Sequence, residues 1–151
     1  MSKEKKFVDK NGEELIIRHR KSAIFFEREA DQTKIKKAFR SDEIYYELSE
    51  LEKKYYFGKD LEKEIMEYLK EIATEVWKDY IPKEADSFGS DYFEYYDREF
   101  DGNGYLSIGN ENYWRIEGAA AQEPTTPIAR LYKFNKPKFQ SFIYDLEKKL
   151  G

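Results

Sequence analysis

The sequence predicts an α+β fold, and three observations support this prediction. Segments rich in β-branched and aromatic residues, separated by Asn-Gly and glycine-rich turns, indicate antiparallel strands in both halves of the chain. Apolar residues at helical spacing indicate helices in the middle and at the C-terminus. The length of 151 residues, without repeats or a Gly/Ser-rich linker, fits one domain. We therefore expect residues 1–151 to form a single α+β domain with a mainly antiparallel sheet, a central helical pair and a C-terminal amphipathic helix.

The first strands are predicted close to the N-terminus. Asn11-Gly12 separates two β-rich stretches, and Asn-Gly accepts the positive φ angles of a type I′ turn, so residues 7–18 should form a hairpin. Residues 23–27 should form a third strand, although a helix over 23–39 is a competing interpretation because short apolar runs are ambiguous. If the strand forms, residues 34–39 should be a short helix.

Two helices are predicted in the middle of the chain. Ser41 can cap the first helix and Gly58 can end it, and the second should run from about Asp60 to about Tyr80. We expect the two helices to pack as an antiparallel pair joined by a tight glycine turn. Their apolar faces are Ile44, Leu48, Leu51 and Tyr55 in the first, and Leu61, Ile65, Leu69, Ile72 and Val76 in the second. Tyr46 lies off the first face and should be exposed.

The C-terminal half is predicted to hold four strands and a helix. Turns rich in Asp, Gly and Asn separate the first three strands. Asn135 should cap the helix, which has Pro137 in its first turn. The strands are expected over residues 92–100, 105–108, 112–117 and 128–134, and the apolar face of the helix comprises Phe139, Phe142, Ile143, Leu146 and Leu150.

The composition excludes several kinds of chemistry. Cysteine is absent and His19 is the one histidine, which excludes disulfides, thiol catalysis, zinc-thiolate and iron-sulfur centres and sites that need several imidazoles. We interpret His19 as a structural or surface residue. No cofactor is predicted. No run approaches the roughly 20 apolar residues of a membrane span and the first residues are charged, so we expect a cytoplasmic protein without membrane contact.

The net charge of −4 is unevenly distributed along the chain. Residues 1–83 are neutral, the last 28 residues carry +4, and residues 84–123 carry ten acidic side chains against Arg98 and Arg115, a net −8. This acidic segment is also rich in Phe, Tyr and Trp, whereas disordered acidic segments are poor in them. It should therefore fold, with side chains of alternate residues on opposite faces of its strands.

The acidic aromatic segment is the best candidate for a functional surface. Exposed Tyr and Trp among carboxylates are typical of binding hot spots, while the alternative is that the rings pack inside and only the acids are exposed. We predict that residues 91–117 bind a basic site on a partner protein, without direct contact with nucleic acid. The predicted partner-binding residues are Tyr92, Tyr95, Tyr96, Asp97, Asp101, Glu111, Tyr113 and Trp114.

A nuclease or another nucleic-acid-handling protein is the expected kind of partner, because its positive cleft suits carboxylates spaced along strands. Inhibitors and immunity proteins encoded by phages or mobile elements would suit this kind of surface, although the sequence shares no motif with them. The expected function is thus non-enzymatic protein binding. The basic residues in the first forty are offset by acids, and we interpret them as solvated faces.

Two alternatives remain open. In the first, an aromatic platform and carboxylates bind or hydrolyse a small ligand or carbohydrate. In the second, the turn from Asp101 to Ser107 binds calcium, because it resembles the calcium loop of EF-hand proteins. Asn110 stands where that loop needs a bidentate carboxylate, so a simple turn between strands is preferred. The resemblance implies calcium ligands at Glu99, Asp101, Asn103, Tyr105 and Ser107.

Overall fold

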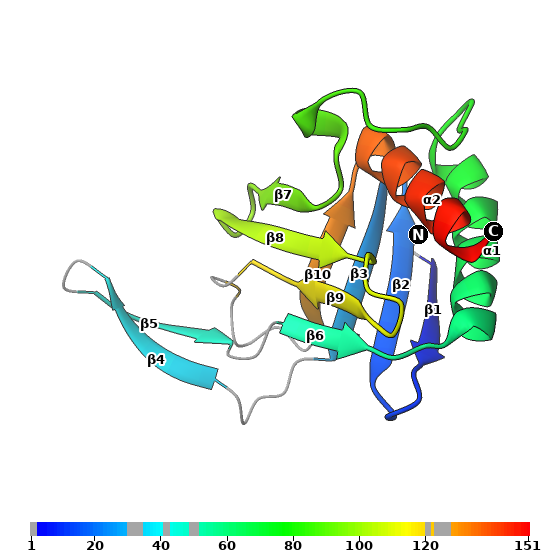
Figure 1. The fold of residues 1–151 in the computed structure, drawn as a ribbon. Coiled ribbons are helices and arrows are strands. Elements are labelled where there is room, and N and C mark those ends of the chain that lie inside the picture. Colours follow the sequence, from blue (N-terminus) through cyan, green and yellow to red (C-terminus); the bar gives the residue numbers. More distant parts are fainter. Residues whose placement is uncertain (1–2, 30–34, 41–42, 49–51, 120–121, 123–127) are drawn as a thin grey trace.

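The computed structural model describes residues 3–29, 35–40, 43–48, 52–119, 122 and 128–151. This part of the chain forms two four-stranded antiparallel sheets, a separate two-stranded ribbon and two α-helices (Figure 1), which confirms the predicted α+β class. In Figure 1, helix α2 (Lys136–Leu150) and one four-stranded sheet lie on the same side of the other four-stranded sheet, which contains the N-terminal strands.

The first sheet, sheet A, joins both ends of the chain. Its strand order is β1-β2-β3-β10, with every neighbouring pair antiparallel. The predicted N-terminal hairpin is confirmed, but its loop is not a type I′ turn, because among the loop residues only Gly12 has a positive φ, of 82°. The bounds are β1 Lys3–Val8, β2 Glu14–Arg20, β3 Ala23–Glu29 and β10 Ile128–Phe134.

The second sheet, sheet C, contains the acidic aromatic segment. Its strand order is β6-β9-β8-β7, again antiparallel throughout. The three strands predicted between residues 92 and 117 are therefore present, with β7 shorter and β8 earlier than expected. The bounds are β6 Glu52–Tyr55, β7 Glu94–Asp97, β8 Gly102–Ser107 and β9 Trp114–Glu117.

The two helices are α1, Lys59–Val76, and α2, Lys136–Leu150. The cap predicted for α2 is confirmed, because the Asn135 side chain accepts a hydrogen bond of 2.9 Å from the backbone N–H of Lys138. Both helices bury the faces that their periodicity predicts, and they pack against each other. Among the described residues, neither helix combines the length and apolar character needed to cross a membrane.

The predicted helix over residues 41–58 is wrong, and so is the short helix over 34–39. The described residues there are strands: β4 Ile35–Arg40 pairs with β5 Glu43–Leu48, and β6 follows. The helical spacing of the apolar residues was misleading because β6 gains its partners from distant parts of the chain. Tyr55 lies opposite Trp114 in β9, and its hydroxyl donates to the backbone carbonyl of Glu14 at 2.9 Å. The helix that packs against α1 is α2.

Aromatic rings fill the space between the two sheets and the helices. The ring of Phe26 in sheet A lies 5.0 Å from Phe134 and 5.9 Å from Phe142 of α2. Trp114 from sheet C lies 5.7 Å from Phe142 and 5.1 Å from Phe57. Buried rings of this size dominate core energetics. Much of the unusual aromatic content thus serves the core.

Candidate functional site

Alternation along β7 decides which of the predicted binding residues reach solvent. Glu94 and Tyr96 point outwards, whereas Tyr95 and Asp97 point into the protein, as the two-residue period of a strand requires. Tyr96 is 57% exposed and Tyr95 is 5% exposed. Of the three predicted partner contacts on this strand, Tyr95, Tyr96 and Asp97, only Tyr96 therefore reaches solvent.

Tyr95 and Asp97 belong to a buried network with Arg130 of β10. The Asp97 carboxylate accepts hydrogen bonds from the Arg130 guanidinium at 2.9 Å and from the Tyr95 hydroxyl at 3.4 Å. Burial raises the pKa of Tyr95. Its ring covers Gly104, where a Cβ atom would lie 2.0 Å from a ring carbon. Both residues thus join sheet C to sheet A.

Tyr92 and Trp114 also serve the interior. The Tyr92 hydroxyl donates to Asp145 of α2 at 2.8 Å, and burial raises its pKa. The Trp114 indole is fully buried and donates to Glu62 of α1 at 2.6 Å. Neither ring is available to a partner in this structure. Tyr46, the other aromatic expected to be exposed, lies outside the residues whose side chains the structure describes.

The outward side of sheet C combines carboxylates with tyrosines, and we call it the acidic face. In one row across all four strands, Glu94 lies opposite Tyr105, Tyr105 opposite Glu117, and Glu117 opposite Glu52. Neighbouring strands are about 4.8 Å apart, so this row places three carboxylates across one open surface. The acidic face comprises Glu52, Glu94, Tyr96, Asp101, Asn103, Tyr105, Arg115 and Glu117.

Polar contacts hold two carboxylates of the acidic face without neutralising them. The Tyr96 hydroxyl donates to Asp101, and this hydrogen bond raises the pKa of Tyr96. The Asn103 amide donates to Glu94 at 2.9 Å. Both donors are uncharged, so each carboxylate keeps its negative charge and loses some of its freedom to move.

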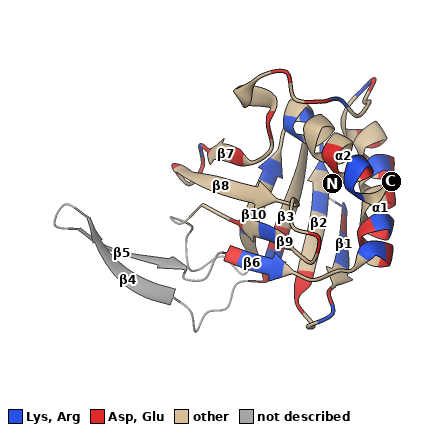
Figure 2. Cartoon of the chain, in the orientation of Figure 1, with Lys and Arg blue, Asp and Glu red and all other residues tan. Residues whose placement is uncertain are grey.

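The opposite end of the acidic face is more balanced in charge. Arg115 lies 3.0 Å from Glu52 and 3.8 Å from Glu117, and exposed Lys54 is its neighbour on β6. Figure 2 shows the mixed signs on β6 and the acidic residues around β7 and the turn into β8. At the other end, neither Glu94 nor Asp101 forms a salt bridge with a described residue, although the Lys138 amine lies 2.7 Å from the Glu94 backbone carbonyl and exposed Arg98 follows β7.

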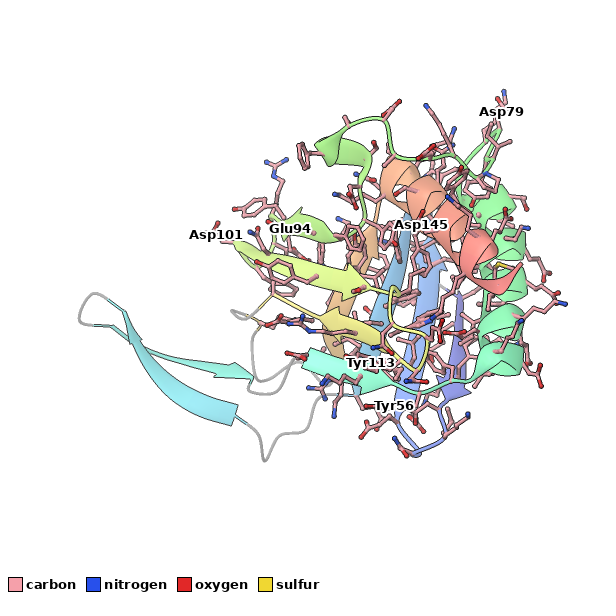
Figure 3. The ribbon with its side chains drawn as sticks, in the orientation of Figure 1. Tyr56, Asp79, Glu94, Asp101, Tyr113 and Asp145 are labelled. Atoms are coloured by element: carbon pink, nitrogen blue, oxygen red, sulfur yellow. The ribbon has the colours of Figure 1, made fainter. Side chains whose placement is uncertain are left out.

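The other two predicted residues lie away from that end. Tyr113 is half-buried, its ring is 5.5 Å from Tyr56, and the Lys54 amine lies 5.2 Å from its centre. Glu111 is exposed in the preceding loop. Figure 3 shows Tyr113 beside Tyr56 at one end of sheet C, and Glu94 and Asp101 at the other. From the predicted set, the structure therefore brings only Tyr96 and Asp101 together on the exposed surface, while Tyr95 and Asp97 meet in the interior.

The resemblance to a calcium loop does not extend to the conformation. Asn103, Tyr105 and Ser107 lie on one side of β8, so their side chains are spread along a strand and cannot surround one ion. Glu99 is 3.0 Å from Arg130, and Asp101 accepts from Tyr96. Within the described ranges, no group of three His, Cys, Asp or Glu side chains could hold a metal ion. The extended backbone of β8 therefore does not favour the calcium alternative, which stays an untested prediction.

His19 is buried at the interface between sheet A and α1. Its Nε2 atom lies 3.2 Å from the Glu75 carboxylate. The two residues are 56 positions apart in the chain, so the sequence could not reveal this contact. The contact joins β2 to α1, which fits a structural imidazole.

Sequence reasoning missed the aromatic side chain that is most exposed among those the structure describes. Phe88 is 97% exposed in a short 3-10 turn, and Phe93 and Tyr105 are also exposed. Phe93, Tyr105 and Arg115 border a shallow depression of about 200 Å³ beside the acidic face. The signal for Phe88 was its setting in Ser87-Phe88-Gly89-Ser90, where small neighbours leave a ring nothing local to pack against.

Comparison of the chain with protein-family models, curated proteins and solved structures gave no match. The function is therefore argued from the arrangement of the site.

Proposed function

We propose that this chain is a small non-enzymatic protein that binds a basic site on a partner protein through the acidic face of sheet C. One observation carries the proposal: Glu94 and Asp101 are held by uncharged donors next to the exposed rings of Tyr96 and Tyr105. This places aromatic rings on the same open surface as two carboxylates that form no salt bridge with a described residue.

The two kinds of side chain have different roles in the proposal. Carboxylates at Glu94, Asp101 and Glu117 steer a basic partner during encounter and exclude acidic ones. Tyr96 and Tyr105 supply apolar contact area, each with a hydroxyl for hydrogen bonding. A nucleic-acid-handling protein, whose cleft is positive, is the partner class that suits this surface best, as for nuclease inhibitors and immunity proteins in general.

The state of the buried carboxylates favours binding over hydrolysis. Glu27 is hydrogen-bonded to Arg18, Glu62 to Lys149 and Asp97 to Arg130, each at 2.8 to 2.9 Å. A general acid or base has to reach a substrate, whereas each of these carboxylates is buried and bound to a cation of the core. These buried acids therefore suit the core, and the acids that remain exposed suit recognition.

A pull-down from the native host with a charge-neutralised variant tests the proposal. The variant combines Glu94→Gln, Asp101→Asn and Glu117→Gln. Asp101 has a φ of 47°, and asparagine tolerates this region well, so the turn should persist. The partner recovered with the wild-type chain should bind the variant at least about tenfold more weakly, because three attractive charges are lost.

The matched control neutralises three exposed acids on α1, with Glu64→Gln, Glu67→Gln and Glu71→Gln. It changes the net charge equally on a different surface. Binding of the wild-type chain should also weaken between about 0.1 M and about 1 M salt, as the screening length falls from about 10 to about 3 Å. Equal losses in the two variants, or an affinity that salt does not change, would refute the role of the acidic face.

A further inference from the structure

Phe88 is displayed to solvent more completely than any other large apolar side chain that the structure describes. It begins the 3-10 turn Phe88–Ser90, and 97% of its surface is exposed. Single exposed apolar residues are common and need no special explanation. Two further observations distinguish Phe88 from an ordinary exposed residue: hydrogen bonds hold its turn in place, and acidic residues surround it.

The turn that carries Phe88 is fixed by hydrogen bonds. The Ser90 hydroxyl accepts from the backbone N–H of Ser87 at 3.1 Å and of Asp86 at 3.2 Å. The Ser141 hydroxyl of α2 donates to the Ser90 carbonyl at 2.7 Å. Because the backbone is already ordered, binding through Phe88 would not require the loss of loop entropy that weakens many interfaces.

The same helix also fixes the turn relative to the acidic face. The Lys138 amine donates to the backbone carbonyls of Asp91 and Glu94, each at 2.7 Å. Glu94 is six positions after Phe88, so their Cα atoms are at most about 20 Å apart. Both features therefore fit within one interface of standard size, about 800 Å² on each partner.

The surroundings of Phe88 are acidic. Glu84 and Asp86 are exposed, and Asp91 is half-buried. Lys83 lies 3.2 Å from Asp86 and, chiefly by this contact, lowers the pKa of that carboxyl, which keeps it ionised. Three acids against Lys83 and the half-buried Lys138 leave a small negative excess, which disfavours an anionic membrane surface and favours a partner with cations around an apolar site.

We propose that Phe88 is the apolar anchor of the partner interface and inserts into an apolar socket rimmed by Lys or Arg. This inference rests on the proposed function and specifies the chemistry of the partner. Burial of the Phe88 ring in the socket contributes affinity, because it removes apolar surface from water. The acidic face steers the basic partner during encounter.

The test measures the affinity of the purified partner that the wild-type chain recovers from the native host. Phe88→Ala should weaken binding about 10- to 100-fold, because burial of a phenylalanine contributes about 1.5 to 3 kcal/mol. Phe88→Leu should restore most of this loss. Val8→Ala is the matched control, because Val8 is an exposed apolar residue of β1, and it should bind like the wild type.

Two readouts separate this inference from the proposed function. Phe88→Ala removes no charge, so the salt dependence of its weaker binding should equal that of the wild type. A Phe88→Ala affinity within twofold of the wild type, while the acidic-face variant binds weakly, would refute the anchor and leave the function standing. If Phe88→Ala binds weakly and the acidic-face variant binds like the wild type, the role of the acidic face is refuted and Phe88 remains a contact of the partner. Binding to phosphatidylserine vesicles that Phe88→Ala abolishes would overturn the choice of a protein partner.

Discussion

The buried contact between Glu62 and Lys149 should be one of the main determinants of stability. The Glu62 carboxylate is 4% exposed, and one of its oxygens accepts from the Trp114 indole at 2.6 Å and from the Lys149 amine at 2.8 Å. This single atom therefore joins α1, β9 and α2. Lys149→Met would leave the carboxylate buried with only the indole as partner.

The expected loss in Lys149→Met is about 2 to 3 kcal/mol in the free energy of unfolding, because a buried charged group loses its ionic partner. The Lys149 side chain is 17% exposed, so water can compensate for part of the loss, and we expect less than the 3 to 5 kcal/mol of a fully buried pair. For a chain of this length the melting temperature should fall by about 4 to 12 °C.

The double variant Glu62→Gln with Lys149→Met serves as the control. It removes both charges and keeps an acceptor for the Trp114 indole, so it should recover to within about 1 kcal/mol of the wild type. Urea unfolding followed by tryptophan fluorescence and circular dichroism measures four proteins: the wild type, Glu62→Gln, Lys149→Met and the double variant. A loss below about 0.5 kcal/mol in Lys149→Met, or a double variant as unstable as the sum of its single changes, would refute this account of the contact.

Three further predictions follow from buried and exposed aromatic residues. Gly104→Ala should destabilise the protein by about 1 to 3 kcal/mol in urea unfolding, because its Cβ would collide with the Tyr95 ring, whereas Gly109→Ala, whose nearest neighbour would be 4.0 Å away, should change stability by less than about 0.5 kcal/mol. Tyr96→Ala should weaken partner binding and leave the free energy of unfolding nearly unchanged, because this ring is exposed. Trp114→Ala should lower the free energy of unfolding by about 3 to 5 kcal/mol, because this ring is buried. If Tyr96→Ala lowers stability and Trp114→Ala does not, our assignment of these two rings is wrong. Burial raises the pKa values of Tyr55, Tyr92, Tyr95 and Tyr132, so stability should be complete below the unfolded tyrosine pKa of about 10 and fall as the pH rises above it; a urea midpoint that stays constant through this range would contradict the burial of these hydroxyls.

Local sequence signals predicted the elements whose capping and periodicity agree. Residues 128–134 were expected to form a strand and are β10, and Asn135 caps α2 as its position before a proline-containing first turn indicated. The prediction for residues 41–58 was wrong because the spacing of Ile44, Leu48 and Tyr55 fits a helix, while the same residue types also occur in strands. The pairing of β5 with the neighbouring β4, and of Tyr55 in β6 with Trp114 far along the chain, decides between the two.

For a related reason, some of the predicted binding residues are exposed and others are buried. Alternation correctly indicated that Tyr95 and Tyr96 face opposite ways, but a strand pattern with aromatics on both faces does not say which face is covered. The covering groups are Tyr132 and Arg130, which sheet A brings against Tyr95 and Asp97. Burial of Trp114 similarly depends on Glu62 and Phe142, from two helices.

The sequence by itself determined that this protein lacks cysteine chemistry and multi-histidine sites, that it combines strands with helices, and that one folded segment concentrates negative charge and aromatic rings. These properties depend on composition and on spacing between near neighbours. The tertiary structure decided which of those rings and acids reach solvent. It buried Tyr92, Tyr95, Asp97 and Trp114, and it exposed Phe88 and Tyr96, because exposure depends on contacts between residues that are remote in the chain.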